Sequence, residues 1–150
     1  MLKWISKKRN RKGFTLVELV VVIAILGILA AIAVPRLSKS RVSAAVAAHN
    51  ANVRTLESAA TLAVSEGLST EMNWEENDNN SGTYGWTNYL QSWPTLPAGI
   101  NGLEATIEVV DDDDQSVTYE EGTITETDYK VSIAGNGTII VTPGKIADYD

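Results

Sequence analysis

One charged side chain stands inside an apolar run, and it raises the first chemical question about this chain. The run extends from Phe14 to Val34, and Glu18 is its sole charge. A carboxylate inside a membrane costs about 2.5–3.5 kcal/mol, so it usually has a partner. No lysine or arginine lies between Phe14 and Pro35, but a cut after Gly13 would give Phe14 a free amine. A cut at that position is therefore one way in which Glu18 could gain a cationic partner.

The apolar run must form the element that positions this carboxylate. A helix over residues 14–34 would span roughly 30 Å, the thickness of a bilayer core. Six basic residues and no acidic ones precede it: Lys3, Lys7, Lys8, Arg9, Arg11 and Lys12. The positive-inside rule then places residues 1–12 in the cytoplasm and the body of the protein outside.

Three other interpretations of the run remain open from these residues. A secretory signal peptide is one, because Ala31-Ile32-Ala33 has the pattern of its cleavage site. A plain membrane anchor is the second. A buried core helix of a soluble protein is the third, although the length and the flanking charge argue against it. Glu18 is the residue that none of these three interpretations requires.

The segment Lys12-Gly13-Phe14-Thr15-Leu16-Val17-Glu18 resembles the prepilin cleavage motif of bacterial type IV pilins and pseudopilins, which carry a class III signal peptide. The resemblance covers roughly residues 7 to 60, and Pro35 matches a proline common in that family. It implies that a prepilin peptidase cuts between Gly13 and Phe14 and methylates the new amine. It also implies that Glu18 pairs with the Phe14 amine of a neighbouring subunit during assembly.

This resemblance predicts a structural subunit of an extracellular type IV pilus on the cell surface. The precursor would cross the cytoplasmic membrane once, contact its lipid and the pilus assembly machinery, and then polymerise with further copies into a helical filament. A pseudopilin of a type II secretion or DNA-uptake machine is the alternative within the same class, and a membrane-tethered adhesive module is the alternative outside it. We expect no enzyme, since the sequence has no G-x-S-x-G, no phosphate-binding glycine loop and no H-E-x-x-H.

The charge and the lack of cysteine exclude further kinds of partner and chemistry. Residues 14–150 carry six basic and nineteen acidic residues, a sum of 6 − 19 = −13. This charge repels phosphate backbones, so we predict no specific nucleic-acid partner. The absence of cysteine excludes disulfides and thiolate chemistry. The chain thereby departs from the many pilins whose C-terminal loop is closed by a disulfide.

We expect four segments: a cleaved leader (residues 1–13), a transmembrane and filament-core helix (14–35), an amphipathic helix (36–66) and a globular head (67–150). Gly27 and Pro35 bracket a stretch that can bend or locally melt, and Gly67 is a helix terminator. His49 falls on the apolar stripe and is predicted to pack rather than to act as a ligand or base. The apolar stripe consists of Val42, Val46, Val53, Leu56, Ala60 and Ala63.

The head is predicted to be an antiparallel sheet with a small aromatic core. Strand patterns occur at residues 105–109, 116–119, 129–133 and 138–142, and Asn136-Gly137 is a tight-turn signal. The fold class is therefore α+β: a long N-terminal helix whose second half packs on a small sheet of three to four strands. We expect core packing rather than sugar or partner binding from the aromatic group, which comprises Trp74, Tyr84, Trp86, Tyr89 and Trp93.

The run Asp111-Asp112-Asp113-Asp114 is the densest group of charges. Clustered carboxylates can bind calcium, but this run lacks the glycine and the distal glutamate of an EF-hand loop. We therefore expect an acidic hairpin turn and no cofactor, with these four residues as weak candidates for a calcium site.

Overall fold

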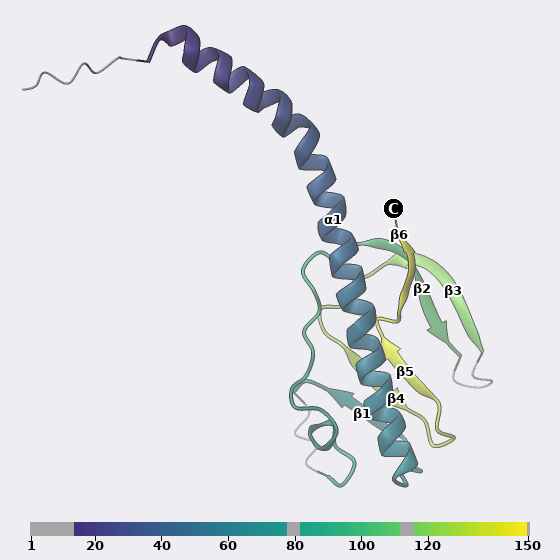
Figure 1. Cartoon of the computed structure of the whole chain (residues 1–150). Coiled ribbons are helices and arrows are strands. Elements are labelled where there is room, and N and C mark those ends of the chain that lie inside the picture. The colour runs from purple at the N-terminus through teal and green to yellow at the C-terminus, as the bar shows by residue number, and fades with distance from the viewer. Residues whose placement is uncertain (1–13, 78–81, 112–115, 150) are drawn as a thin grey trace, which may run out of the picture. The chain divides into compact units, whose positions relative to one another are not determined.

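The computed structural model describes residues 14–77, 82–111 and 116–149, which fall into two compact units divided after Lys39 (Figure 1). One helix, α1 (Leu16–Ser65), contributes its first half to the first unit and its second half to the other. Glu18 lies in its first turn and Pro35 lies inside it. The helix continues through Gly27 and Pro35, so the stretch between them is helical in this single chain.

The helix α1 is terminated at Gly67, as the sequence predicted. The Gly67 φ angle of 113° lies in the left-handed region that glycine tolerates best. The Gly67 amide donates to the Val64 carbonyl at 3.1 Å, and the Leu68 amide donates to the Ala63 carbonyl at 3.1 Å. This pair of bonds is the Schellman arrangement that satisfies the last carbonyls of a helix. Leu68 is buried, so the chain leaves the helix directly into the core.

The second unit contains two antiparallel three-stranded sheets (Figure 1). The first sheet has the order β1-β4-β5, from β1 (Met72–Glu75), β4 (Lys130–Ile133) and β5 (Ile139–Thr142). The second has the order β3-β2-β6, from β2 (Glu104–Val110), β3 (Val117–Thr123) and β6 (Ile146–Tyr149). A short 3-10 helix, η1 (Trp86–Asn88), lies in the connection between β1 and β2.

The α+β class and the four predicted strands are confirmed, but the strands divide between two sheets instead of forming one. Two short strands that the sequence patterns missed complete the two sheets. β1 pairs with β4 and β6 pairs with β2, so each adds a third strand to one of the two predicted pairs. β1 and β6 have only four residues each, too few to carry a clear alternating signal.

The second half of α1 supplies one side of both parts of the core. One cluster joins Val53, Leu56 and Ala60 to the buried Trp74 and Val131 of the first sheet. The other joins Ala45 and Val46 to Ile100, Ala105 and Ile146. The predicted apolar stripe is confirmed, with Val42 partly buried and its other members buried. The helix therefore holds the two sheets on one apolar face.

Candidate functional site

Glu18 closes the first turn of α1 by a reciprocal set of hydrogen bonds with Thr15. The Glu18 amide donates to Thr15 Oγ1 at 3.2 Å. In return, Glu18 Oε2 accepts from the Thr15 amide at 3.3 Å and from Thr15 Oγ1 at 3.4 Å. This arrangement is a capping box, in which Thr15 precedes the helix and the glutamate lies three residues later.

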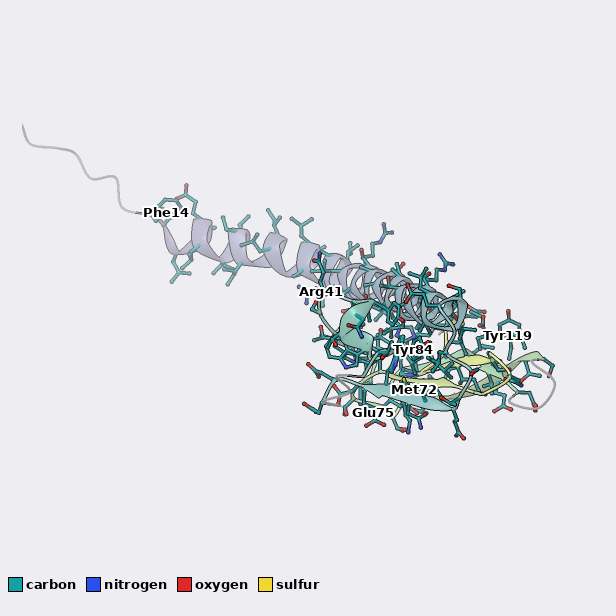
Figure 2. The ribbon with its side chains drawn as sticks, turned by 90° about the horizontal axis from the view of Figure 1, so that it is seen from below. Phe14, Arg41, Met72, Glu75, Tyr84 and Tyr119 are labelled. Atoms are coloured by element: carbon teal, nitrogen blue, oxygen red, sulfur yellow. The ribbon has the colours of Figure 1, made fainter. Side chains whose placement is uncertain are left out.

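The capping box adds a structural role for Glu18 that our sequence reasoning missed. The spacing Thr15-x-x-Glu18 is its sequence signature. The carboxylate has hydrogen-bond donors within its own chain, but no ion pair offsets its charge among the described residues. Gly13, the other side of the predicted cut, lies outside the described residues. Phe14 is 80% exposed and lies at the beginning of the described chain (Figure 2).

The first half of α1 leaves its apolar side chains uncovered. Residues 14–41 are all exposed, including leucines, isoleucines and valines on every side of the helix. By length and composition α1 could cross a membrane, and no part of its most apolar window is buried. An isolated helix that is apolar all round needs lipid or other protein to cover it. The apolar surface of this segment must therefore be covered by a membrane, by neighbouring chains, or by first one and then the other.

His49 is buried on α1 and connects three separate parts of the second unit. Its Nε2 lies 2.8 Å from the Gly144 carbonyl oxygen and its Nδ1 lies 2.9 Å from the Tyr129 hydroxyl. A carbonyl can only accept, so the proton is assigned to Nε2, and Nδ1 accepts from Tyr129. Burial lowers the pKa of His49 below its ordinary 6.5, and the bond to Gly144 offsets only part of this. Burial also raises the pKa of Tyr129 to about 12, which keeps its hydroxyl protonated.

The neighbouring residues of α1 hold the same C-terminal stretch. Asn50 makes two hydrogen bonds with the backbone of Ile146. Asn50 Nδ2 donates to the Ile146 carbonyl, and the Ile146 amide donates to Asn50 Oδ1, each at 2.8 Å. Lys145 Nζ lies 2.7 Å from Glu57 of α1 and 3.2 Å from Glu108 of β2. Burial acts to lower the pKa of Lys145, but the two carboxylates outweigh it and raise the pKa.

We call His49, Asn50 and Lys145, with the groups they bind, the C-terminal clamp. Gly144 lies at its centre, where a β-carbon would collide with the Glu108 carbonyl oxygen. The clamp ties the last strand to α1 by hydrogen bonds and ion pairs, without cysteine. The sequence predicted that His49 packs, which is confirmed, but it carried no signal for the roles of Asn50 and Gly144.

The aromatic residues form core rather than an exposed platform, as predicted. Trp74 is fully buried, stacks on Tyr89 at 5.7 Å between ring centroids and donates from Nε1 to the Tyr84 carbonyl at 3.0 Å. Trp86 and Trp93 meet edge to face at 5.3 Å. These rings fill the space beside α1 that a domain without disulfides must pack with large side chains.

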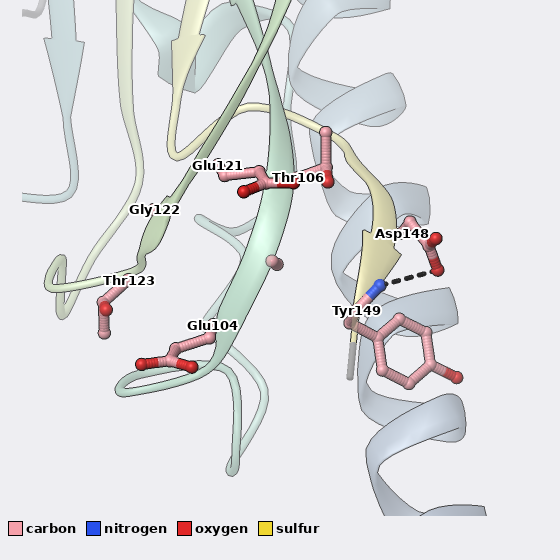
Figure 3. Close-up of a pocket in the computed structure, with 8 residues that line it drawn as sticks. Glu104, Thr106, Glu121, Gly122, Thr123, Asp148 and Tyr149 are labelled. Carbon is pink, nitrogen blue, oxygen red and sulfur yellow. Dashed lines mark hydrogen bonds between the residues drawn. The ribbon is translucent and has the colours of Figure 1, made fainter.

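The outer face of the second sheet carries a hollow of about 400 Å³ with carboxylates around it (Figure 3). Glu121 of β3 and Asp148 of β6 both pair with Thr106 of β2, and Glu104 lies two residues away. No group of three or more acidic, histidine or cysteine residues in the described ranges is arranged to hold a metal ion. Asp111 is exposed at the end of β2, while Asp112, Asp113 and Asp114 lie outside the described residues.

Residues 8–34 match the family described as the prokaryotic N-terminal methylation motif. Two fimbrial proteins of Pseudomonas aeruginosa are each 46% identical to this chain over 59 residues. The aligned region covers 39% of this chain and 38% of each relative, so the likeness spans well under half of either protein. No solved structure matches this chain. The comparisons confirm the resemblance expected from the residues around Gly13.

Proposed function

We propose that this chain is a structural subunit of a type IV pilus. The premise is that residues 8–34 match the prokaryotic N-terminal methylation motif. The precursor is anchored in the cytoplasmic membrane by the first half of α1. The mature subunit lies in a filament on the cell surface, where the helices of other copies replace the lipid. The exposed apolar half of α1, with Glu18 in its first turn, is the observation that carries this proposal.

Processing and docking follow from the same segment. A prepilin peptidase cuts between Gly13 and Phe14, and the new amine of Phe14 is methylated. Glu18 then pairs with the Phe14 amine of a neighbouring copy. The Glu18 carboxylate has no cationic partner among the described residues of its own chain. In the filament it gains one from a neighbouring copy, and this favours transfer of the subunit from lipid to filament.

Electron microscopy of shed surface filaments, with N-terminal sequencing of the subunit, tests the proposal. We expect fibres whose subunit begins at a methylated Phe14. A mature chain that begins after Ala33 would show a secretory signal peptide and overturn the proposal. A correctly cut chain without visible fibres would instead favour a pseudopilin, and an uncut chain would favour a tethered module.

A further inference from the structure

A second hollow, of about 260 Å³, lies between the two sheets. β2 and β3 line it on one side, and β5 with the turn Pro143–Lys145 lines it on the other. Val53 and Glu57 of α1 complete its lining. Residues of both sheets and of α1 therefore meet around this hollow.

The lining combines apolar surface with carboxylates. Val109 is 39% exposed, and Ile107 and Ile140 are only partly buried, so apolar area remains open. Glu57 and Glu108 share one cation, Lys145, as their ion-pair partner. The other lining carboxylates, Glu120, Glu121 and Glu126, have no ion pair among the described residues. A fitting occupant therefore brings both an apolar side chain and positive charge.

The head cannot supply that charge. Residues 67–150 contain two cations, Lys130 and Lys145, and both are paired within the chain, Lys130 with Glu75. The remaining cations after residue 13 all lie on α1, are exposed and have no ion pair in the described ranges: Arg36, Lys39, Arg41 and Arg54. Three of these four fall within six residues, next to Leu37, which is 54% exposed. We call residues 36–41 the basic turn.

We propose that the hollow between the sheets of one subunit receives the basic turn of a neighbouring copy. Leu37 covers the apolar lining, and Arg36, Lys39 and Arg41 face the three unpaired carboxylates. A contact between two different patches is heterologous, and such contacts propagate into open helical arrays. Without it, heads with a large excess of acidic residues would repel each other when packed side by side. This inference rests on the proposed function, because it requires copies stacked in a filament.

Charge reversal in assembled filaments tests the contact. We expect the basic-turn variant Arg36→Glu/Lys39→Glu/Arg41→Glu, and separately the hollow variant Glu120→Lys/Glu121→Lys, each to lower filament yield about tenfold, because like charges would then meet. Combining the two sets should restore most of the yield. The matched control, Glu104→Lys/Asp148→Lys, changes the net charge equally on exposed residues of the same sheet that do not line this hollow, and should assemble normally.

Cross-linking gives a second readout with no background, since the chain has no cysteine. Filaments of Leu37→Cys/Val109→Cys treated with a short bis-maleimide should give a ladder of linked subunits. Leu37→Cys/Glu104→Cys should give none. Unchanged melting temperatures of the solubilised variants would show that the heads still fold.

The outcomes separate this inference from the function on which it rests. Normal yields for both reversed variants, or no cross-link in intact filaments of Leu37→Cys/Val109→Cys, would overturn the contact and leave the filament role standing. No filaments from the unmodified chain would overturn the proposed function, and the contact would fall with it.

Discussion

Glu18 combines two properties that a single substitution to alanine would remove together. Its carboxylate caps the first turn of α1 through Thr15, and its charge is the proposed docking group. The sequence predicted the second property from an isolated charge in an apolar run. The first was equally readable from the threonine three residues earlier.

Glu18→Gln separates the cap from the charge. Glutamine keeps an oxygen that can accept from the Thr15 amide, but it has no charge to pair with an amine. We expect normal processing and little or no filament, measured by N-terminal sequencing and by the mass of sheared fibres. Thr15→Ala is the matched control, because it weakens the cap and keeps the charge. Normal assembly of Glu18→Gln would show that capping, not charge, is what assembly needs.

The burial of His49 makes the stability of the head depend on pH. Its pKa is lowered in the folded state, so the unfolded chain binds the proton more readily. Stability is therefore full above about pH 6.5 and falls as the pH drops below that value, by at most about 1.4 kcal/mol per pH unit. Denaturant titration of the detergent-solubilised chain between pH 7.5 and 5 measures this slope.

His49→Gln provides the comparison for that slope. Glutamine can still donate to the Gly144 carbonyl but does not titrate, so the variant should be less stable at pH 7.5 and lose less stability on acidification. Equal slopes for the two proteins would assign the acid sensitivity to carboxylates instead.

The C-terminal strand β6 depends on α1 as much as on its own sheet. Asn50 satisfies both the amide and the carbonyl of Ile146. Asn50→Ala should leave these groups short of partners and cost about 1–3 kcal/mol for each one left unsatisfied. We expect a lower melting temperature and faster amide exchange throughout residues 146–149.

Thr55→Ala is the control on the same helix, because Thr55 is exposed and its hydroxyl donates to the Ala51 carbonyl within α1. If Asn50→Ala exchanged amides in β6 no faster than Thr55→Ala, the sheet alone would hold the strand.

The elements also show where sequence reasoning reaches its limit. The end of α1 was predictable because Gly67 acts through its own backbone, and the apolar stripe because its period is local. The four longer patterns were recognisable as strands for the same reason. The short strands β1 and β6 were not recognisable, because each is defined by a partner far away in sequence. The clamp was not predictable either, because Asn50 and Gly144 acquire their roles only through contacts between segments that lie far apart in the sequence.

For the molecule as a whole, the proposed cut after Gly13 would decide whether the N-terminal segment can assemble. We expect Gly13→Leu to block the proposed cut, because a bulky side chain would then stand directly before the bond to be cleaved. The chain would then keep its first thirteen residues and an unmethylated terminus, which mass spectrometry of the membrane fraction would reveal. Phe14 would then have no free amine to pair with Glu18 of a neighbouring copy, so we expect no filaments. A fully processed Gly13→Leu chain would contradict this role for the glycine.

The clamp also fixes the order in which the head can be completed. His49 and Asn50 bind backbone groups 95 and 96 residues further along the chain. Contacts over such distances form late, since a long loop must close before they contribute. Until Gly144 and Ile146 have emerged, His49 has no carbonyl to bind and Val46 lacks the cover of Ile146. We therefore expect translation products that stop short of Ile146 to remain open and to be degraded.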